Sequence, residues 1–282
     1  MSKRRDIEAH VRTLDEIEGI MRVMKNLALM ESHKLSRLLA TQHLVVESIE
    51  AAGQDFLAFH PTFVPEFSGK ELYLVIGTER GFCGDFNDRL LAALDGHLRT
   101  TDDRDPVLIL VGRKLVERAE RIHRIAAAVE GPTVTEEVQP ILTRVIDQLR
   151  EAATQRASGG RAPVTAVYHD AVTESAVVRP LRPFPSPPSA HRRPFPPLLT
   201  LPPPVFFSQL VDWYLFSLLH AIFYSALMAE NRARLAHLES AIQRLERDET
   251  DLLRRRNLLR QEEITEEIQM LMLSTLVQGR HR

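Results

Sequence analysis

The stretch Leu235-Ala-His-Leu-Glu-Ser-Ala-Ile-Gln-Arg-Leu245 places apolar residues at steps of three and four, and the rhythm continues to Leu259. A narrow apolar stripe of this kind is typical of a coiled-coil seam. A matching stripe near the other end of the chain consists of Ile7, Val11, Leu14, Ile17, Met21, Met24 and Ala28. Each stripe would face water unless it met the other. The sequence therefore predicts that the two ends pair as a long antiparallel coiled coil.

Both predicted helices are unusually long. The C-terminal one should run from about Val205 to Val277, a stretch without Pro or Gly, and the N-terminal one from about Arg5 to Phe56, before His60-Pro61. At 1.5 Å per residue these helices would be roughly 100 Å and roughly 75 Å long. A compact domain does not need helices of this length, whereas a shaft or spacer does.

The middle of the chain alternates between apolar runs and amphipathic segments. Buried strands are predicted at 72–76, 107–111 and 164–168, and helices at 88–98, 114–125 and 135–154. Strands that alternate with helices favour an α/β fold with a small, mostly parallel sheet covered by helices. The predicted segments are 1–60 (N-terminal coiled-coil helix), 70–180 (α/β domain), 181–204 (proline-rich connector) and 205–282 (C-terminal coiled-coil helix).

Two segments allow more than one interpretation. The stretch 180–204 holds eleven of the 17 prolines, so it should be extended; a stiff connector is favoured over a ligand for a proline-binding domain. The apolar stretch 205–228 has the length of a membrane span, but it contains Gln209, Asp212 and His220, which are costly in hydrocarbon. A helix buried by protein on most sides is therefore favoured over a direct membrane span.

Composition narrows the function. The net charge of −2 gives no reason to expect nucleic acid or an anionic membrane surface as a partner. The single cysteine excludes an intrachain disulfide and suits a reducing compartment. The chain contains no phosphate-loop, zinc-protease, C-x-x-C or nucleophile-elbow motif, and its histidines are scattered. We therefore expect no catalytic residue, no metal and no cofactor. The turn Gly112-Arg-Lys114 could contact a phosphate, but a plain strand-to-helix turn is favoured.

One glycine-containing segment follows the first predicted strand. It reads Gly77-Thr-Glu-Arg-Gly-Phe-Cys-Gly-Asp-Phe-Asn87. Its glycines permit a tight turn or a close backbone approach, but the G-x-G-x-x-G spacing of a dinucleotide loop is not met. The segment is interpreted as a structural turn whose key residues are Gly81, Cys83, Gly84 and Asn87.

This segment also resembles the S/T-D/E-R-G-L-C-G-x-x-N signature of the gamma subunit of F-type ATP synthases. Two further stretches are similar to elements of that family: Ala229-Glu-Asn-Arg-Ala-Arg-Leu235 to S-E-x-x-A-R-M, and Asn257 to Ile268 to N-x-x-R-Q-A-x-I-T-x-E-I. The three occur in family order across nearly the whole chain. The chain departs from the family at 26–31, at 270–277 and in its proline-rich stretch, which indicates a divergent member.

The resemblance implies a fold and a function. It implies an α/β domain that is Rossmann-like, and a non-catalytic rotor shaft that couples proton or sodium flow to ATP synthesis or hydrolysis on the beta subunits. The implied partners are the alpha and beta subunits, the epsilon subunit and the membrane c-ring, at the cytoplasmic face of the cell membrane. Arg260, Gln261 and Glu267 match the family pattern and would contact a beta subunit. The apolar stretch 270–277 is expected to be a partner surface.

Two other function classes remain open at this stage. The first is an enzyme that uses the α/β domain to bind a nucleotide; the missing phosphate loop counts against it. A coiled-coil adaptor unrelated to ATP synthase would show the same paired helices. A nucleotide titration of the chain would test the first alternative, and co-purification with alpha and beta subunits would test the second.

Overall fold

A computed structural model describes residues 2–64, 67, 69–120, 123–156, 162–184 and 195–279. The chain forms two compact units. The helical unit consists of Met1–Leu27 and Ala236–Arg282, and the sheet unit of Ala28–Leu235. Two long helices, α1 (Ser2–Phe59) and α5 (Pro203–Gly279), contribute to both units. The four-segment division expected from the sequence stays a prediction.

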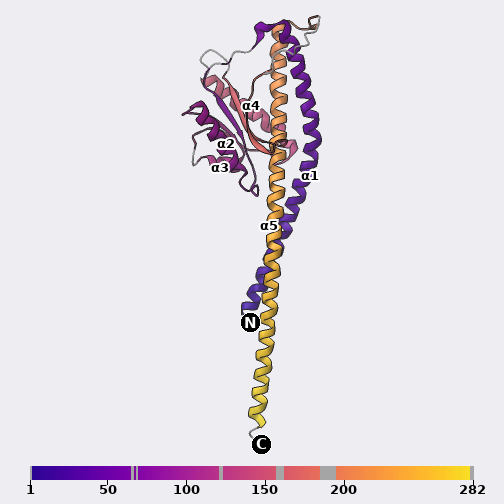
Figure 1. Cartoon of the computed structure of the whole chain (residues 1–282), viewed down its shortest axis with the longest axis vertical. Helices are drawn as coiled ribbons and strands as arrows, with labels where there is room; N and C mark the ends of the chain where they lie inside the picture. Colours follow the sequence, from indigo (N-terminus) through magenta and orange to yellow (C-terminus); the bar gives the residue numbers. More distant parts are fainter. Residues whose placement is uncertain are drawn as a thin grey trace. The chain divides into compact units, whose positions relative to one another are not determined.

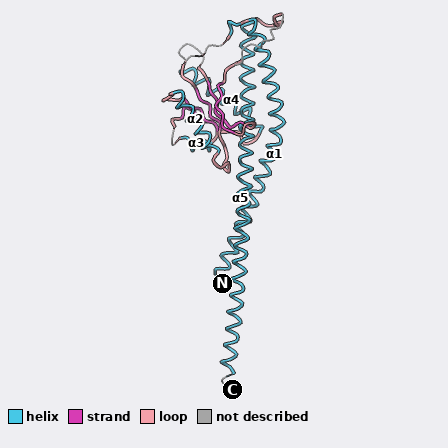
Figure 2. Tube along the Cα trace, in the orientation of Figure 1, coloured by secondary structure: helices cyan, strands magenta, loops and turns pink. Residues whose placement is uncertain are grey.

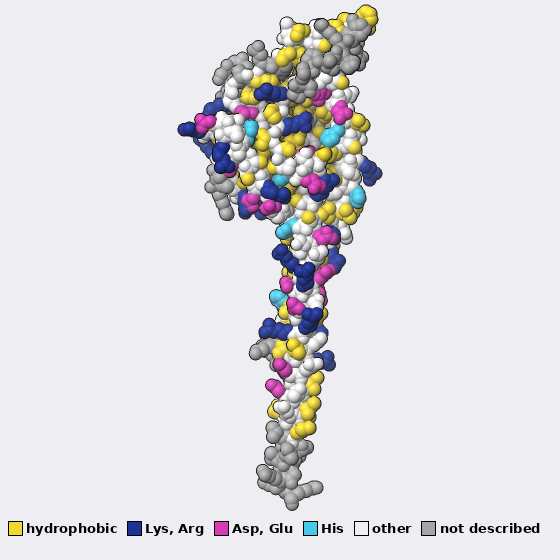
Figure 3. Space-filling model, viewed as in Figure 1, with side chains coloured by type: hydrophobic (Ala, Val, Ile, Leu, Met, Phe, Trp, Pro, Cys, Tyr) yellow, Lys and Arg dark blue, Asp and Glu magenta, His cyan; other side chains and the backbone are white. Residues whose placement is uncertain are grey.

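In the helical unit, α1 and α5 lie side by side in opposite directions (Figures 1 and 2). Met21, Leu238 and Ile242 form its buried core. Among the described side chains, three ion pairs cross between the helices: Lys25–Glu239 at 2.9 Å, Arg22–Glu246 at 2.7 Å and Arg4–Glu263 at 3.6 Å. The numbering rises on α5 as it falls on α1, so the predicted antiparallel pairing is confirmed. The surface of this unit mixes both signs of charge with hydrophobic side chains (Figure 3).

One residue of the predicted N-terminal stripe departs from the expectation. Leu14 and Met21 are buried, but Ile17 between them is 41% exposed. Two paired helices cover only one narrow stripe of each other, so a side chain at the edge of that stripe keeps much of its contact with water.

The sheet unit is built on a mixed five-stranded sheet in the order β3-β2-β1-β4-β5. The strands are β1 (Leu72–Ile76), β2 (Val107–Val111), β3 (Ile125–Val129), β4 (Val164–Asp170) and β5 (Ser175–Pro180). β1 pairs in parallel with β2 and β4, β2 pairs in parallel with β3, and β5 pairs antiparallel to β4. The predicted α/β fold with a mostly parallel sheet is confirmed.

Helices cover both faces of this sheet. On one face, α2 (Phe86–Thr101) and α3 (Arg113–Ala119) pack against strand residues such as Val75 and Leu110. On the other face, α4 (Val138–Arg156) and the sheet-unit parts of α1 and α5 pack against residues such as Leu74 and Ile109. Two short 3₁₀ helices, η1 (Pro61–Phe63) and η2 (Thr135–Glu137), lie in the connections. Because both faces of the sheet are covered, the central strands β1 and β2 are buried at every position and consist of hydrophobic residues.

The apolar start of α5 is part of this core. Phe207, Tyr214 and Phe223 are buried in the same cluster as residues of α1 and of the sheet, as the sequence predicted. Within the described residues, α5 alone has the length and composition to cross a membrane, and 61% of its most apolar window is buried inside the protein. A buried core helix can have the same length and composition as a membrane span. Since most of this window is covered by protein, a core helix is favoured.

The sequence prediction missed two strands and lengthened one helix. The helix expected at 114–125 ends at Ala119, and Ile125 already belongs to β3. β3 reads Ile-Ala-Ala-Ala-Val, and alanine favours helix by intrinsic propensity. β5 was missed because it is an edge strand that ends at Pro180. Both strands are at the edges of the sheet, where pairing with a neighbouring strand overrides the local pattern.

Candidate functional site

The turn after β1 is held by a side-chain clamp. The backbone N–H of Thr78 donates to Asn87 Oδ1 at 3.1 Å, and Asn87 Nδ2 donates to Thr78 Oγ1 at 2.9 Å. A Cβ atom on Gly77 would lie 2.7 Å from Asn87 Oδ1 and 2.7 Å from Leu115 Cβ. The turn therefore requires glycine at position 77 and an amide side chain at position 87.

The left-handed backbone positions of this turn are Phe82, with φ 65°, and Gly84, with φ 61°. Glycine adopts this conformation without strain, which explains Gly84. Gly81 has neither a positive φ nor a close neighbour at its Cβ position. Its contribution is instead its carbonyl oxygen, which accepts a hydrogen bond from Arg234 Nε at 3.3 Å.

A buried ion pair on α5 lies against the turn. Glu230 is 4% exposed and Arg234 is 7% exposed, and the two side chains are joined by a hydrogen bond one helical turn apart. Arg234 also donates to Asn231 Oδ1 at 3.1 Å. Burial raises the pKa of the Glu230 carboxyl, and the guanidinium of Arg234 offsets part of that rise. Within the described residues, the hydrogen-bond acceptors of the guanidinium lie on α5 and in the turn 77–87, called the signature turn below, so the pair fastens the helix to this turn.

Cys83 closes the same cluster. Its side chain is 8% exposed, and its Sγ lies 3.9 Å from the carbonyl oxygen of Glu230. Burial, assisted by the charge of Glu230, raises the pKa of the thiol to about 12. The thiolate is the nucleophilic and metal-binding form of cysteine, and the raised pKa disfavours this form in the folded protein.

Glu79 links the turn after β1 to the turns after β2 and β3. Its Oε2 accepts hydrogen bonds from the backbone N–H of Arg113, at 2.8 Å, and of Gly131, at 2.9 Å. These groups follow β2 and β3, so one carboxylate links the carboxyl ends of three neighbouring parallel strands. The amide at the start of α3 thus already has an anionic partner from the protein itself. The Gly112-Arg-Lys114 turn is part of this arrangement, with Gly112 at φ 108°.

The predicted partner-contact residues lie elsewhere, on the part of α5 that belongs to the helical unit. Arg260, Gln261 and Glu267 are all exposed. In the described part of the chain, their side chains make no hydrogen bond or ion pair. The structure does not bring them together with the turn residues. Met270, Leu271 and Met272 are also exposed, at 70%, 67% and 62%, whereas the side chains of 273–277 lie outside the described residues.

Sequence reasoning missed Glu79, Glu230 and Arg234 as site residues, although the quoted motifs contain all three. A signal was available, because acidic and basic residues inside two otherwise separate motifs need partners if the motifs are buried. Which residue meets which is decided only by the tertiary fold.

Comparison with known proteins places these motifs in a family. The sequence model of the ATP synthase family matches residues 3–272. The mitochondrial ATP synthase gamma subunit of Pichia angusta is 26% identical over 119 residues, which cover 42% of each chain. That of Yarrowia lipolytica is 26% identical over 113 residues, covering 39% of this chain and 37% of its own. The alignments thus span about two fifths of the length of these curated relatives.

Solved structures share the fold. A chain in the Euglena gracilis mitochondrial ATP synthase OSCP/F1/c-ring structure superposes with a TM-score of 0.63 at 14% identity, covering 98% of this chain and 94% of its own. A chain in the Tetrahymena thermophila central stalk/c-ring structure gives a TM-score of 0.52 at 15% identity, covering 79% and 99%. Since the family model matches nearly the whole chain and the curated relatives are gamma subunits, this chain belongs to the gamma-subunit family of ATP synthase.

Proposed function

We propose that this chain is the central rotor-shaft subunit of an F-type ATP synthase, coupling proton or sodium flow to ATP synthesis or hydrolysis on the beta subunits. The observation that carries the proposal is the antiparallel pairing of α1 and α5, which the family membership makes specific. A rotating shaft must resist twisting, and two helices that share a buried seam resist twisting better than one. The three interhelical ion pairs add directional contacts along this seam, although exposed pairs stabilise it only weakly.

The buried pair Glu230–Arg234 supports the same proposal. In the sheet unit, torque applied to α5 would pass to the sheet through the contact between this helix and the signature turn. Arg234 contacts the turn through the carbonyl of Gly81, and the guanidinium fork fixes the direction of that contact. We infer that the two motifs act together, because the guanidinium of one contacts a backbone carbonyl of the other.

We propose that Arg260, Gln261 and Glu267 contact a beta subunit of the catalytic ring. Their exposure leaves five guanidinium donors, an amide and a carboxylate available to a partner loop. The test is the double variant R260A/Q261A in the reconstituted complex, with E267A measured separately. The matched control is R255A, which removes an exposed arginine from the same helix.

The double variant should reduce ATPase turnover while the chain remains folded, because alanine preserves the helix. The control should keep wild-type turnover. Wild-type turnover and coupling in R260A/Q261A would contradict the contact, and an equal loss in R255A would mean that general charge on α5, not the matched pair, is responsible.

The proposed partners are the alpha and beta subunits, the epsilon subunit and the membrane c-ring. The similar solved structures are an OSCP/F1/c-ring assembly and a central stalk/c-ring assembly, which supports this assignment. We propose a peripheral position at the cytoplasmic face of the cell membrane. Affinity purification of the tagged full chain should recover alpha and beta subunits from detergent-solubilised membranes. Recovery of the chain without them would contradict the proposed role.

We further propose that the chain alone is not an enzyme. The amide at the start of α3 already donates to Glu79, so the turn after β2 does not offer this group to a phosphate. Among the described residues, no group of three His, Cys, Asp or Glu side chains is placed to hold a metal ion. Purified chain free of beta subunit should therefore show no ATP turnover and no saturable nucleotide binding. Either activity would favour the alternative of a nucleotide enzyme.

The exposed residues 270–272 favour a sleeve around the end of α5 in the complex. Deletion of 271–282 should weaken the thermal stability of the complex and make the free chain more soluble. If neither changes, this end of the helix is not a buried partner surface.

A further inference from the structure

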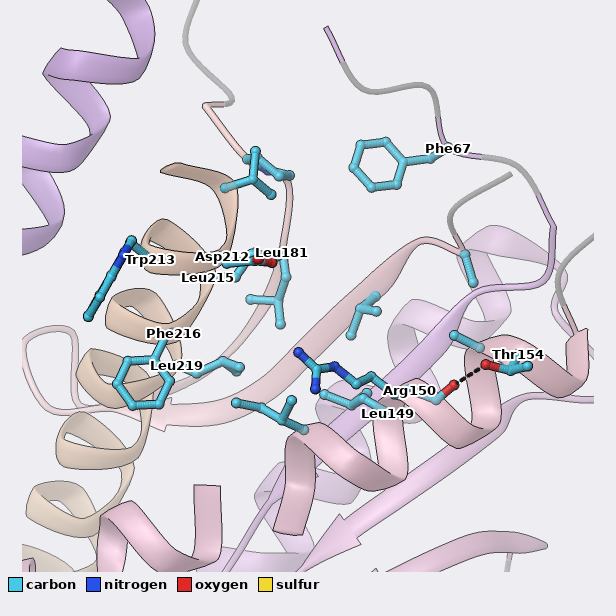
Figure 4. A pocket seen from close by; sticks show the side chains of 16 residues that line it. Phe67, Leu149, Arg150, Thr154, Leu181, Asp212, Trp213, Leu215, Phe216 and Leu219 are labelled. Atoms are coloured by element: carbon cyan, nitrogen blue, oxygen red, sulfur yellow. Dashed lines mark hydrogen bonds between the residues drawn. The ribbon is translucent and has the colours of Figure 1, made fainter. Parts of the chain in front are cut away.

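A cavity of about 690 Å³ lies within the sheet unit, between α4, the start of α5 and the segment that follows β5 (Figure 4). This volume is in the range of small-molecule sites in proteins. Apolar side chains form most of its wall, among them Leu149, Leu181 and Phe216. Neither the rotor function proposed above nor the signature turn uses this cavity.

The polar groups at the cavity are few and distinct. Arg150 extends from α4 with its guanidinium directed into the space between the apolar walls (Figure 4). Within the described part of the chain, this guanidinium has no ion-pair partner, and it is exposed to solvent. Among the described residues that line the cavity, Asp212 contributes the one carboxylate, from the exposed side of α5. The remaining polar contributors are Thr154 and Trp213.

We propose that this cavity binds a single-chain anionic amphiphile, such as a fatty acid, with its hydrocarbon chain against the apolar wall and its carboxylate on Arg150. A guanidinium binds a carboxylate through two parallel N–H···O bonds, which fixes the orientation of the ligand. An apolar ligand alone would make no use of the guanidinium of Arg150, whereas a carboxylate gains a charge-assisted hydrogen bond from it. A cationic head group would place two positive charges together.

Trp213 makes the proposal directly measurable. It is the single tryptophan of the chain, it lines the cavity, and it is 63% exposed. A ligand that enters the cavity should remove water from the indole and change its fluorescence. Full-length chain is titrated with laurate below its micelle-forming concentration, and in parallel with dodecanol and dodecyltrimethylammonium, which have the same chain length but neutral and cationic heads.

Laurate should give a saturable change of Trp213 fluorescence and bind more tightly than either control amphiphile. R150A should weaken laurate binding by about tenfold or more, the usual loss for a hydrogen bond to a charged group, and should hardly change dodecanol binding. The matched control R144A removes an arginine of the same helix that pairs with Glu130 and does not line the cavity. It should bind laurate like the wild type. D212N should leave laurate binding intact or strengthen it.

Three results would overturn the proposal. The first is a fluorescence change that does not saturate, or no change. The second is equal laurate affinity in R150A and the wild type. The third is equal or tighter binding of dodecanol or dodecyltrimethylammonium, which would indicate an apolar surface covered by a protein partner, or a cationic ligand held by Asp212. None of these readouts depends on ATPase activity, so the rotor function can fail or stand separately.

Discussion

Replacing Arg234 by alanine should be among the most damaging single changes in the sheet unit. The substitution removes the guanidinium that contacts Glu230, Asn231 and the carbonyl of Gly81. It leaves the Glu230 carboxyl in a site where only 4% of the residue is exposed. Removing one member of a buried ion pair typically costs about 3–5 kcal/mol, because the remaining charge has no compensation.

The loss should depend on pH in a defined direction. The pKa of Glu230 is raised above its ordinary value of 4.5, so the carboxyl opposes folding as pH rises through its folded-state pKa. Without Arg234 that pKa rises further, since the guanidinium lowers it. R234A should therefore lose more stability at about pH 8 than at about pH 6, and each unit of additional pKa shift corresponds to about 1.4 kcal/mol.

The assay is urea unfolding followed by the fluorescence of Trp213, which belongs to the same unit as the ion pair. The matched control is R118A. Arg118 also forms a two-bond ion pair, with Asp88, but both side chains are about half exposed. Removing an exposed pair should cost about 0–1 kcal/mol. The double variant E230L/R234M should recover much of the loss, because apolar residues of similar size can replace a buried pair.

A loss of unfolding free energy in R234A no larger than that in R118A would refute the role of Arg234 in compensating the buried charge. It is also refuted if the loss in R234A is the same at both pH values, or if the double variant is less stable than R234A. The first result would mean that water reaches Glu230. The other two would mean that the guanidinium acts through packing and not through charge compensation.

Three further predictions concern the turn and its surroundings. Cys83, buried and with its pKa raised to about 12, should react with an aromatic disulfide reagent only after urea unfolding; fast reaction in the native protein would contradict its burial. G77A should destabilise the sheet unit by about 1–3 kcal/mol, because the added methyl group would overpack against Leu115. G81A should be nearly neutral in the same unfolding assay, because no atom lies near its Cβ position. Burial lowers the pKa of His169 below its ordinary 6.5, so the stability that the neutral imidazole contributes is present above that value and is lost as pH falls. H169Q should therefore lose less stability than the wild type between about pH 7 and about pH 5.5. The same pH dependence of stability in both proteins would exclude His169 as the source of that dependence.

The long helices could be predicted well from the sequence. Leu238 and Ile242 lie at helical spacing in a stretch without proline or glycine, and a stripe of that length can be buried only by another helix. The buried strands β1 and β2 could also be predicted, because five consecutive apolar residues bounded by turn residues have few other stable arrangements. The edge strand β3 could not, because its alanines carry no signal for pairing.

The site was only partly predictable. The signature turn could be located from its glycines, and the family resemblance named Arg260 and Gln261 as contacts, which stay predictions. The function of Gly81 could not be read from its type, since what matters is its carbonyl oxygen and the guanidinium that reaches it.

The sequence by itself determined the local periodicities: two helical stripes, the alternation of strands and helices, and the turn chemistry at Gly84 and Asn87. These follow from interactions between residues close along the chain, which a pattern records directly. Only the tertiary structure decided that Glu79 would satisfy the start of α3, and that Glu230 and Arg234 would be buried against the turn. Those choices depend on contacts across up to about 150 residues of sequence, where burial and charge compensation, and not local spacing, select the partner.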